Sequence, residues 1–273
     1  MRVPVLLTNG SKDGEVELPI VFRTPLRNDL IRKAYIHLES HKFQRQGRYP
    51  NAGMDVVAES NSPPTGHGQA RVARMRGGGG GRQGQGGGVA MVRKGRQAHP
   101  PTAEKVIYKT LNKKENKLAL CSAIAATVSH DLVKLRGHKV EKIESLPVVV
   151  SDQIESVSKS KELLKIFDTL NLSQDIKRLE NRQKRRSGKP MLRGRKTKIG
   201  KSILLVVQDS KNLSKACGSL LGVDVVDAKS LSVLDLAPGA KPIRLTVFSK
   251  GSIEELGRMK SPHLELMVTA RWI

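Results

Sequence analysis

The sequence predicts an α/β fold, a three-layer α/β/α domain with a mostly parallel sheet and a long extended internal loop. Continuous apolar runs at 146–151 and 202–207 predict buried strands. Amphipathic segments alternate with such runs from residue 152 onward, which is typical of βαβ units. Neither pattern occurs in the 57 residues from 44 to 100, which predicts a loop. We therefore expect one globular domain over 1–273 with the loop 44–100 inserted in it.

The N-terminal region predicts a hairpin followed by a helix. The stretches PVLL (4–7) and EVELPIVF (15–22) flank the turn-rich stretch TNGSKDG. Thr24 is a suitable N-cap, and Pro25 at the first helical position loses no hydrogen bond. Apolar residues then recur with helical spacing, so we expect an amphipathic helix from Thr24 to about residue 43.

Beyond the loop, the sequence predicts two further helical segments. Thr102 is a plausible N-cap, with Glu104 in the first turn of the helix that it would begin. A long helix is expected over 116–138, and Gly137 near its end can adopt the left-handed conformation that terminates helices.

The second half of the chain alternates between strands and helices. We expect strands at 146–151, 202–207, 223–228 and 243–248. Helical segments are expected around 152–157, 159–170, 173–184, 212–221, 230–236 and 252–259, the last with Ser252 as N-cap.

The charge balance points to a polyanionic partner. The chain has 49 Lys and Arg against 25 Asp and Glu, a formal net charge of +24. No apolar run approaches the roughly 18 to 20 residues that a membrane span needs, and the N-terminal apolar run is too short for a signal peptide. A membrane partner is therefore not expected. Cys121 and Cys217 provide no disulfide framework, which fits the reducing cytoplasm.

Two segments are strongly basic and contain no acidic residue. Residues 60–100 hold seven Arg or Lys and twelve Gly, and residues 182–201 hold ten basic residues in twenty. Arginine suits bidentate phosphate contacts, and glycine allows close backbone approach to a partner. A loop of this length is either functional or disordered, and its composition favours ordering by a folded nucleic acid. Within it, 54–59 and 89–92 could face each other as a loose ribbon.

The candidate RNA-binding residues follow from these two segments and the start of the loop. They are Lys42, Arg45, Arg48, Arg71, Arg74, Arg76, Arg82, Arg93, Lys94 and Arg96, and, in the second segment, Lys184, Arg185, Arg186, Arg193, Arg195, Lys196 and Lys198. Aromatic residues make up only 3% of the chain, which argues against base-stacking modules. Recognition of phosphates and shape in a structured RNA remains.

Sequence motifs for catalysis or metal binding are weak. Gly79, Gly81 and Gly84 satisfy G-x-G-x-x-G, but any glycine run does so, and no buried strand precedes them. The stretch GRKTKIGKS resembles a P-loop with one residue too many, and a strand follows it where a helix is required. His37 and His41 are four residues apart, without a third zinc ligand nearby in sequence. We expect no catalytic residue, no metal and no cofactor, although a Ser/His/Asp group assembled in three dimensions stays open.

Four stretches together resemble the large-subunit ribosomal protein L-four family in its archaeal form. They are TGHGQARVARMRGGGGGRQGQGGG, SAIAAT, RGHKVEKIESLPVVVS and LAPGAK, in that order. The resemblance implies a non-enzymatic structural constituent of the large ribosomal subunit in the cytoplasm, which binds ribosomal RNA and supports assembly. Two alternatives remain open, namely a nucleotide-binding α/β enzyme and a basic RNA-binding regulator outside the ribosome.

The resemblance also implies a position for the loop. It would form part of the polypeptide exit tunnel wall beside a loop of the L-twenty-two family, near the nascent peptide. The tunnel-proximal part would be about residues 60–76, including His67, Gly68, Arg71 and Arg74.

Overall fold

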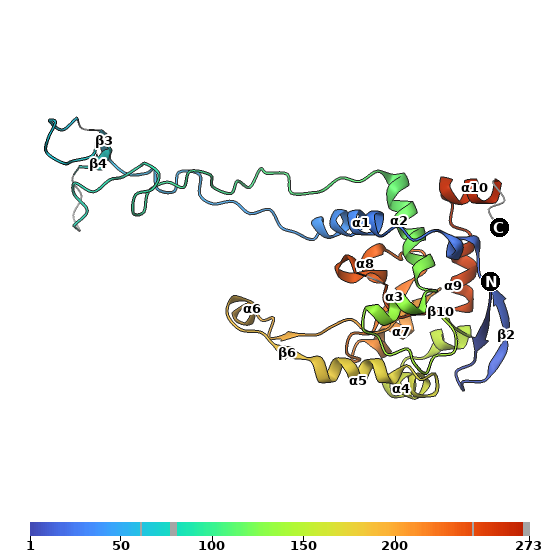
Figure 1. The fold of residues 1–273 in the computed structure, drawn as a ribbon. Coiled ribbons are helices and arrows are strands. Elements are labelled where there is room, and N and C mark those ends of the chain that lie inside the picture. The colour runs from blue at the N-terminus through green and yellow to red at the C-terminus, as the bar shows by residue number, and fades with distance from the viewer. Residues whose placement is uncertain (61, 77–80, 242, 270–273) are drawn as a thin grey trace. The chain divides into compact units, whose positions relative to one another are not determined.

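A six-stranded sheet in the order β2-β1-β5-β10-β8-β9 forms the centre of the fold (Figure 1). Its strands are β1 (Arg2–Leu6), β2 (Lys12–Glu17), β5 (Val148–Val150), β8 (Leu204–Val207), β9 (Asp224–Asp227) and β10 (Thr246–Ser249). Only the β1–β2 pair is antiparallel, and the four other neighbouring pairs are parallel. The predicted mostly parallel sheet is confirmed.

The structure is a computed structural model that describes residues 1–60, 62–76, 81–241 and 243–269. It contains two compact units, one formed by Met1–His41 with Lys109–Ile273 and the other by Lys42–Tyr108. Residue 61 and the glycines at 77–80 belong to the predicted loop, and Gly79 to the G-x-G-x-x-G match, but they lie outside the described residues. Within the described residues, no helix combines the length and apolar content needed to cross a membrane.

Two hydrophobic cores lie on opposite faces of the sheet because successive side chains of a strand alternate between its faces. Val149 belongs to one core, whereas Val148 and Val150 belong to the other. The first core includes buried residues of α1 (Asn28–Ser40), α2 (Lys113–Ala126), α8 (Val233–Leu236) and α9 (Lys250–Gly257). The second includes α3 (His130–Leu135), α4 (Ser160–Thr169), α5 (Ser173–Arg182) and α7 (Lys211–Cys217). This arrangement confirms the predicted three layers.

The remaining elements are short, apart from one C-terminal helix. They are η1 (Ile20–Arg23), β3 (Ala58–Ser60), β4 (Ala73–Met75), η2 (Asp152–Ser156), β6 (Lys184–Arg185), α6 (Lys189–Leu192), β7 (Thr197–Lys198), η3 (Pro238–Ala240) and α10 (Pro262–Thr269). The sequence analysis did not predict α10.

The predicted N-terminal hairpin is confirmed, but the start of the next helix is wrong. The apolar residues after β2 form η1, and the Thr24 hydroxyl donates to the Val21 carbonyl at 2.9 Å. Thr24 therefore ends η1, and α1 begins only at Asn28 and ends at Ser40. Thr24 is thus the C-cap of η1 and not the N-cap of α1.

The helical predictions between residues 102 and 138 are partly wrong. No helix begins at Thr102, and residues 101–112, all of them described, form turns and irregular chain up to α2. The predicted long helix breaks after Ala126, where the Thr127 hydroxyl donates back to the Ile124 carbonyl at 2.7 Å. Gly137 has φ +97°, as expected for its left-handed terminating position.

The alternation in the second half is confirmed, with shorter elements than predicted. The N-cap of α9 differs from the prediction, because the Ser249 side chain accepts a hydrogen bond from the Ser252 N–H at 3.2 Å. Ser249 is the cap, and Ser252 already lies inside the helix.

Candidate nucleic-acid interface

The unit Lys42–Tyr108, hereafter the Gly/Arg unit, brings distant parts of its own chain side by side. The Arg48 N–H donates to the Pro101 carbonyl at 3.3 Å. Strand β3 pairs antiparallel with β4, with Ala58 opposite Met75. The partner strand of 58–60 is therefore β4 and not 89–92, although a Cβ on Gly88 would lie 3.8 Å from Cγ2 of Val56, so the two stretches of the predicted ribbon come close near this point. Residues 90–94 form turns instead, and a φ of +68° at Met91 is incompatible with a strand there.

Glycines are required inside this unit where two parts of the chain almost touch. A Cβ added to Gly53 would lie 2.5 Å from the carbonyl oxygen of Gly95. A Cβ on the buried Gly87 would lie 2.8 Å from Cγ of Met75. The composition of the loop predicted that the glycines allow close contact with a partner, but at these positions they allow close contact within the unit itself.

Two of the predicted RNA-binding arginines hold this unit together. The half-buried Arg74 guanidinium donates to the carbonyls of Gly84 at 2.8 Å and Ala70 at 3.2 Å. The half-buried Arg82 donates to the Arg93 carbonyl at 3.4 Å. A guanidinium has five N–H donors, so each retains donors for a further partner.

Most of the other predicted cations of the unit lie on its surface. Arg76 forms an ion pair with Glu59 at 2.6 Å, and Arg45 lies 5.6 Å from the centre of the Tyr108 ring. Arg48 is half-buried. The exposed residues are Lys42, Arg45, Arg71, Arg76, Arg93, Lys94 and Arg96, together with His67 and Gly68.

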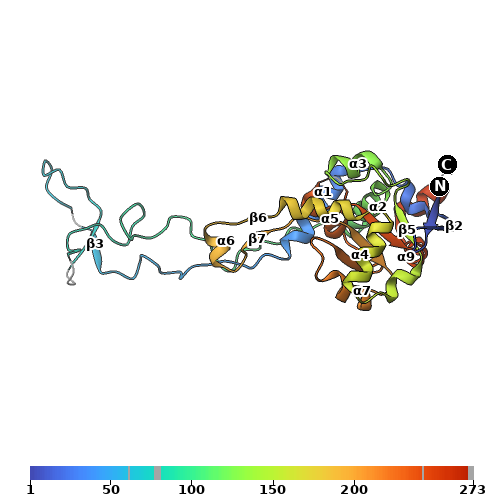
Figure 2. The same ribbon diagram turned by 90° about the horizontal axis from the view of Figure 1, so that it is seen from below.

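Residues 182–201, hereafter the basic hairpin, form two short antiparallel strands, β6 and β7, with α6 between them (Figure 2). Lys184 lies directly opposite Lys198, and the Arg186 N–H donates to the Lys196 carbonyl at 2.8 Å. Like charges directly opposite each other in a sheet are destabilising. A polyanion bound across the hairpin would remove this repulsion.

The structure places all seven predicted cations of this segment in the basic hairpin. Arg186 is half-buried, and the exposed ones are Lys184, Arg185, Arg193, Arg195, Lys196 and Lys198.

A fully buried carboxylate, Asp175, fixes the two ends of the basic hairpin. It lies on α5, which leads into the hairpin, and its Oδ2 accepts from the Ser202 hydroxyl at 2.6 Å just after the hairpin. His138 Nδ1 lies 3.0 Å from the same oxygen, and Arg178 Nε lies 2.9 Å from Oδ1. The Lys139 N–H also donates to Oδ1, at 3.1 Å. Sequence analysis missed this group, since its members lie far apart in the chain.

A buried arginine holds the same end of the hairpin from the other side. The Arg244 guanidinium is 1% exposed and donates to the carbonyls of Ser202, Ile203 and Gly222. It also pairs with Asp224 at 2.6 Å, which in turn accepts from Lys201 Nζ at 2.7 Å. The base of the basic hairpin is therefore anchored through side chains and backbone together.

The Asp175 group contains a serine, a histidine and an aspartate, but it is not connected as a catalytic triad. In a triad the serine hydroxyl is hydrogen-bonded to histidine, which is oriented by aspartate. Here the Ser202 hydroxyl donates to Asp175 itself, and both residues are 0% exposed. This arrangement fits a structural anchor. The buried cysteine thiols also lack nucleophile character, since burial raises the pKa of Cys217 to about 12.

The electrostatics of the anchor predict loss of stability on acidification. Burial would raise the pKa of Asp175, but the hydrogen bonds from His138, Ser202 and Arg178 outweigh it and hold the pKa well below its usual range. Burial lowers the pKa of His138 despite its contact with Asp175. Below about pH 6.5 the histidine of the unfolded chain binds a proton that the folded one does not. The free energy of unfolding therefore decreases as the pH is lowered. The depressed pKa of Asp175 extends the loss below about pH 4.

We therefore expect His138→Gln to flatten the pH dependence of the free energy of unfolding below about pH 6.5. Urea unfolding at several pH values would measure this, with the change in slope approaching about 1.4 kcal/mol per pH unit for one group. His130→Gln, at an exposed position on α3, is the control. Equal slopes in all three proteins would contradict the assignment.

The carboxyl ends of the parallel strands, where open α/β sheets bind nucleotides, are occupied by the protein's own carboxylates. Asp152 accepts from the Gly251 N–H at 2.7 Å, and Glu155 accepts from the Gln208 N–H at 2.8 Å. Backbone N–H groups at this edge of a sheet are common phosphate ligands, and these two already donate to carboxylates. At this edge of the sheet, the carboxylates of Asp152 and Glu155 therefore take the place that phosphate oxygens of a nucleotide would occupy.

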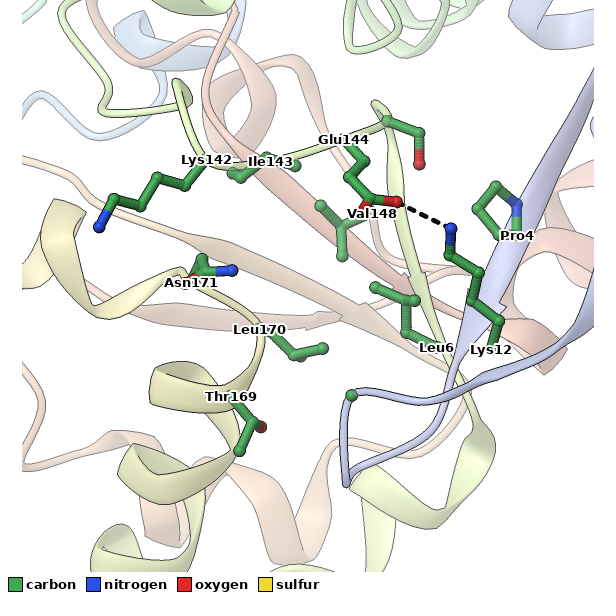
Figure 3. A pocket seen from close by; sticks show the side chains of 12 residues that line it. Pro4, Leu6, Lys12, Lys142, Ile143, Glu144, Val148, Thr169, Leu170 and Asn171 are labelled. Atoms are coloured by element: carbon green, nitrogen blue, oxygen red, sulfur yellow. Dashed lines mark ion pairs between the residues drawn. The ribbon is translucent and has the colours of Figure 1, made fainter.

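A cavity of about 110 Å³ lies beside β1, β5 and the end of α4 (Figure 3). Lys12 and Glu144 form a 2.9 Å ion pair among its lining residues, and Leu6 and Val148 are apolar neighbours. Ligand pockets usually measure roughly 300–1,000 Å³. This cavity is too small for a nucleotide.

The two histidines considered as zinc ligands contact each other edge to face, with ring centres 4.9 Å apart. The His37 ring also bonds to the Lys109 carbonyl. Within the described part of the chain, no three His, Cys, Asp or Glu side chains are grouped so that they could hold a metal ion.

The model of the ribosomal protein L4/L1 family matches residues 16–259. The chain belongs to this family. It is 42% identical over 256 residues to the large ribosomal subunit protein uL4 of Methanococcus maripaludis strain C6, covering 94% of this chain and 98% of the relative. The uL4 protein of Methanocaldococcus jannaschii is 41% identical over 256 residues, with the same coverage. The resemblance to the archaeal form of the family is confirmed.

Family membership extends to both basic segments. The matched range 16–259 contains the Gly/Arg unit and the basic hairpin, whereas α10 follows its end. Both segments therefore lie inside the range over which the chain matches the family.

Proposed function

We propose that the chain is a structural constituent of the archaeal large ribosomal subunit and acts by binding ribosomal RNA. The observation that carries the proposal is the basic hairpin, in which a buried anchor holds two strands with Lys184 directly opposite Lys198. A phosphate backbone supplies the missing negative charge. The relatives named as uL4 support the same role. The mechanism is binding and support of subunit assembly, and no catalytic step is involved.

In this proposal, residues 44–100 are a loop inserted in one α/β domain spanning 1–273, and 182–201 is a second RNA-binding segment on that domain. The exposed cations of both segments bind phosphates. Arg74 and Arg82 position the turns that present the others. The loop forms part of the polypeptide exit tunnel wall, with His67, Gly68, Arg71 and Arg74 nearest to the tunnel. Its neighbours there are the L-twenty-two family protein and the nascent peptide, in the cytoplasm.

The nucleotide-binding enzyme is the weaker alternative. Its usual site is filled by Asp152 and Glu155, and the Ser202 hydroxyl is committed to Asp175. A regulator outside the ribosome would need the same phosphate-binding surface, so fractionation of cell extracts is the measurement that separates the two roles.

Deleting residues 45–99 tests the role of the loop. We expect the variant, closed by a short Gly/Ser linker, to keep its α/β circular dichroism and cooperative unfolding. Its incorporation into large subunits should fall strongly, since the loop arginines no longer join RNA segments. Sucrose-gradient fractionation after a high-salt wash would measure this. Lys161→Ala, at an exposed position on α4, serves as the control. Normal subunit levels with the deletion variant would refute the proposed role.

A further inference from the structure

The tip of the basic hairpin exposes two large apolar side chains. Met191 is 48% exposed and Leu192 is 87% exposed, both at the end of α6. Leucine is usually buried, and here it lies next to Arg193 in a segment without any acidic residue. An apolar tip enclosed by cations is not explained by phosphate binding alone.

The turns on both sides of the tip have backbone conformations that favour glycine. Gly188 precedes α6 with φ +65°, and Gly194 follows it with φ +80°. Neither conformation suits a residue with a side chain. The Arg195 N–H donates to the Pro190 carbonyl at 3.0 Å, which closes the tip. The apolar side chains are thus presented by a defined turn.

The buried anchor at the base of the basic hairpin holds the end of the hairpin in a fixed position. Ser202 is bound through its hydroxyl by Asp175 and through its carbonyl by Arg244. The Arg178 guanidinium donates to the Lys201 carbonyl at 3.3 Å. A pre-organised element loses less conformational entropy on binding than a flexible one, so more of the contact energy remains.

We propose that Leu192, together with Met191, contacts the face of an unpaired nucleobase in the ribosomal RNA. This inference rests on the proposed function. Charge complementarity favours RNA over a protein groove, since an apolar protein surface would have to desolvate Lys189 and Arg193 on either side of the tip. A nucleobase offers an apolar face bordered by phosphates, which matches an apolar tip bordered by cations.

The base must be unpaired, for geometric reasons. Bases within an A-form helix have their faces covered by stacking, and side chains cannot enter the deep, narrow major groove. Loops and bulges expose base faces. Leucine and methionine are among the apolar side chains that proteins insert beside unstacked bases. The basic hairpin would therefore recognise a loop or bulge, with its cations on the flanking phosphates.

The first test is the affinity of the full-length double variant Met191→Ala/Leu192→Ala for large-subunit ribosomal RNA transcribed in vitro. We expect binding about tenfold weaker at every salt concentration between 50 and 200 mM, with the slope against log salt unchanged. Lys198→Ala should instead reduce that slope by about 1. Leu135→Ala is the matched control, because this leucine on α3 is 74% exposed outside the basic segments and should leave binding unchanged.

An unchanged affinity of the double variant would overturn the inference, as would a loss confined to the salt slope. A parent protein that did not bind this RNA at all would refute the proposed function instead, so the two failures are distinguishable.

The second test uses a diazirine side chain placed at position 192 in the full-length protein, followed by reconstitution of large subunits and irradiation. A cross-link to a loop or bulge nucleotide supports the inference. A cross-link to a neighbouring protein, or to a nucleotide within a continuous duplex, overturns it.

Discussion

Replacing Asp175 by asparagine is expected to lower the free energy of unfolding of the α/β unit by about 3–5 kcal/mol. The carboxylate accepts hydrogen bonds from Ser202, His138, Arg178 and the Lys139 N–H, and none of its surface is exposed. Asparagine keeps the shape, but it replaces one acceptor oxygen with a donor and removes the negative charge. The Arg178 side chain, which is only 10% exposed, is then left without its counter-ion, and this loss is the costly part of the change.

Urea unfolding of the purified protein measures this effect, and the unfolding temperature should fall by roughly 6–20 °C for a unit of this size. Asp29→Asn is the matched control. Asp29 also pairs with an arginine, at 2.8 Å, but both side chains are more than half exposed, so little change is expected. Equal unfolding midpoints for the two variants would show that Asp175 is not the anchor described here.

The parts of the fold that the sequence predicted well are those with a local physical signature. Strands buried on both faces appear as continuous apolar runs, and 146–151 and 202–207 were located for that reason. The helix expected at Thr102 failed because a capping residue was followed by no sustained apolar periodicity. A cap stabilises a helix that packing already favours, but it does not create one.

The anchor of the basic hairpin could not be predicted, because it depends on contacts between distant residues. Asp175 meets His138 across 37 positions and Ser202 across 27. In the sequence, Ser202 appeared only as the start of the strand expected at 202–207 and the end of a failed P-loop match. The internal roles of Arg74 and Arg82 were missed for a related reason. Their acceptors are backbone carbonyls, which every residue has, so no residue type marks them.

The sequence did predict the exposed cations of the basic hairpin, because charge density requires no knowledge of tertiary contacts. What the structure adds is their arrangement. Lys184 faces Lys198 across two short strands, and the apolar tip follows in the same hairpin. A loosely held charged segment could also bind phosphates, but it would lose more conformational entropy on binding. The buried anchor indicates that position, and not only charge, matters for this surface.

The affinity of the protein for large-subunit ribosomal RNA is expected to fall by roughly 10³ or more between 50 and 200 mM salt. Each phosphate that a lysine or arginine neutralises releases a condensed counter-ion, and a fall of this size corresponds to six or more such contacts. The two basic segments contain enough exposed cations for that number. Filter binding or fluorescence anisotropy across a salt series would provide the slope.

Charge-removing variants then locate the contacts that produce this slope. The triple variant Lys184→Ala/Arg185→Ala/Lys198→Ala should reduce the slope by about 3, one unit for each lost phosphate contact. The control variant Lys161→Ala/Lys211→Ala/Lys229→Ala removes three exposed lysines outside both basic segments and should leave the slope nearly unchanged. Equal slopes for the two variants would mean that binding follows net charge alone. A flat salt response of the parent would contradict phosphate binding altogether. We expect the salt slope to decrease in the hairpin variant alone, because its three cations are held in fixed positions by the buried anchor at the base of the basic hairpin.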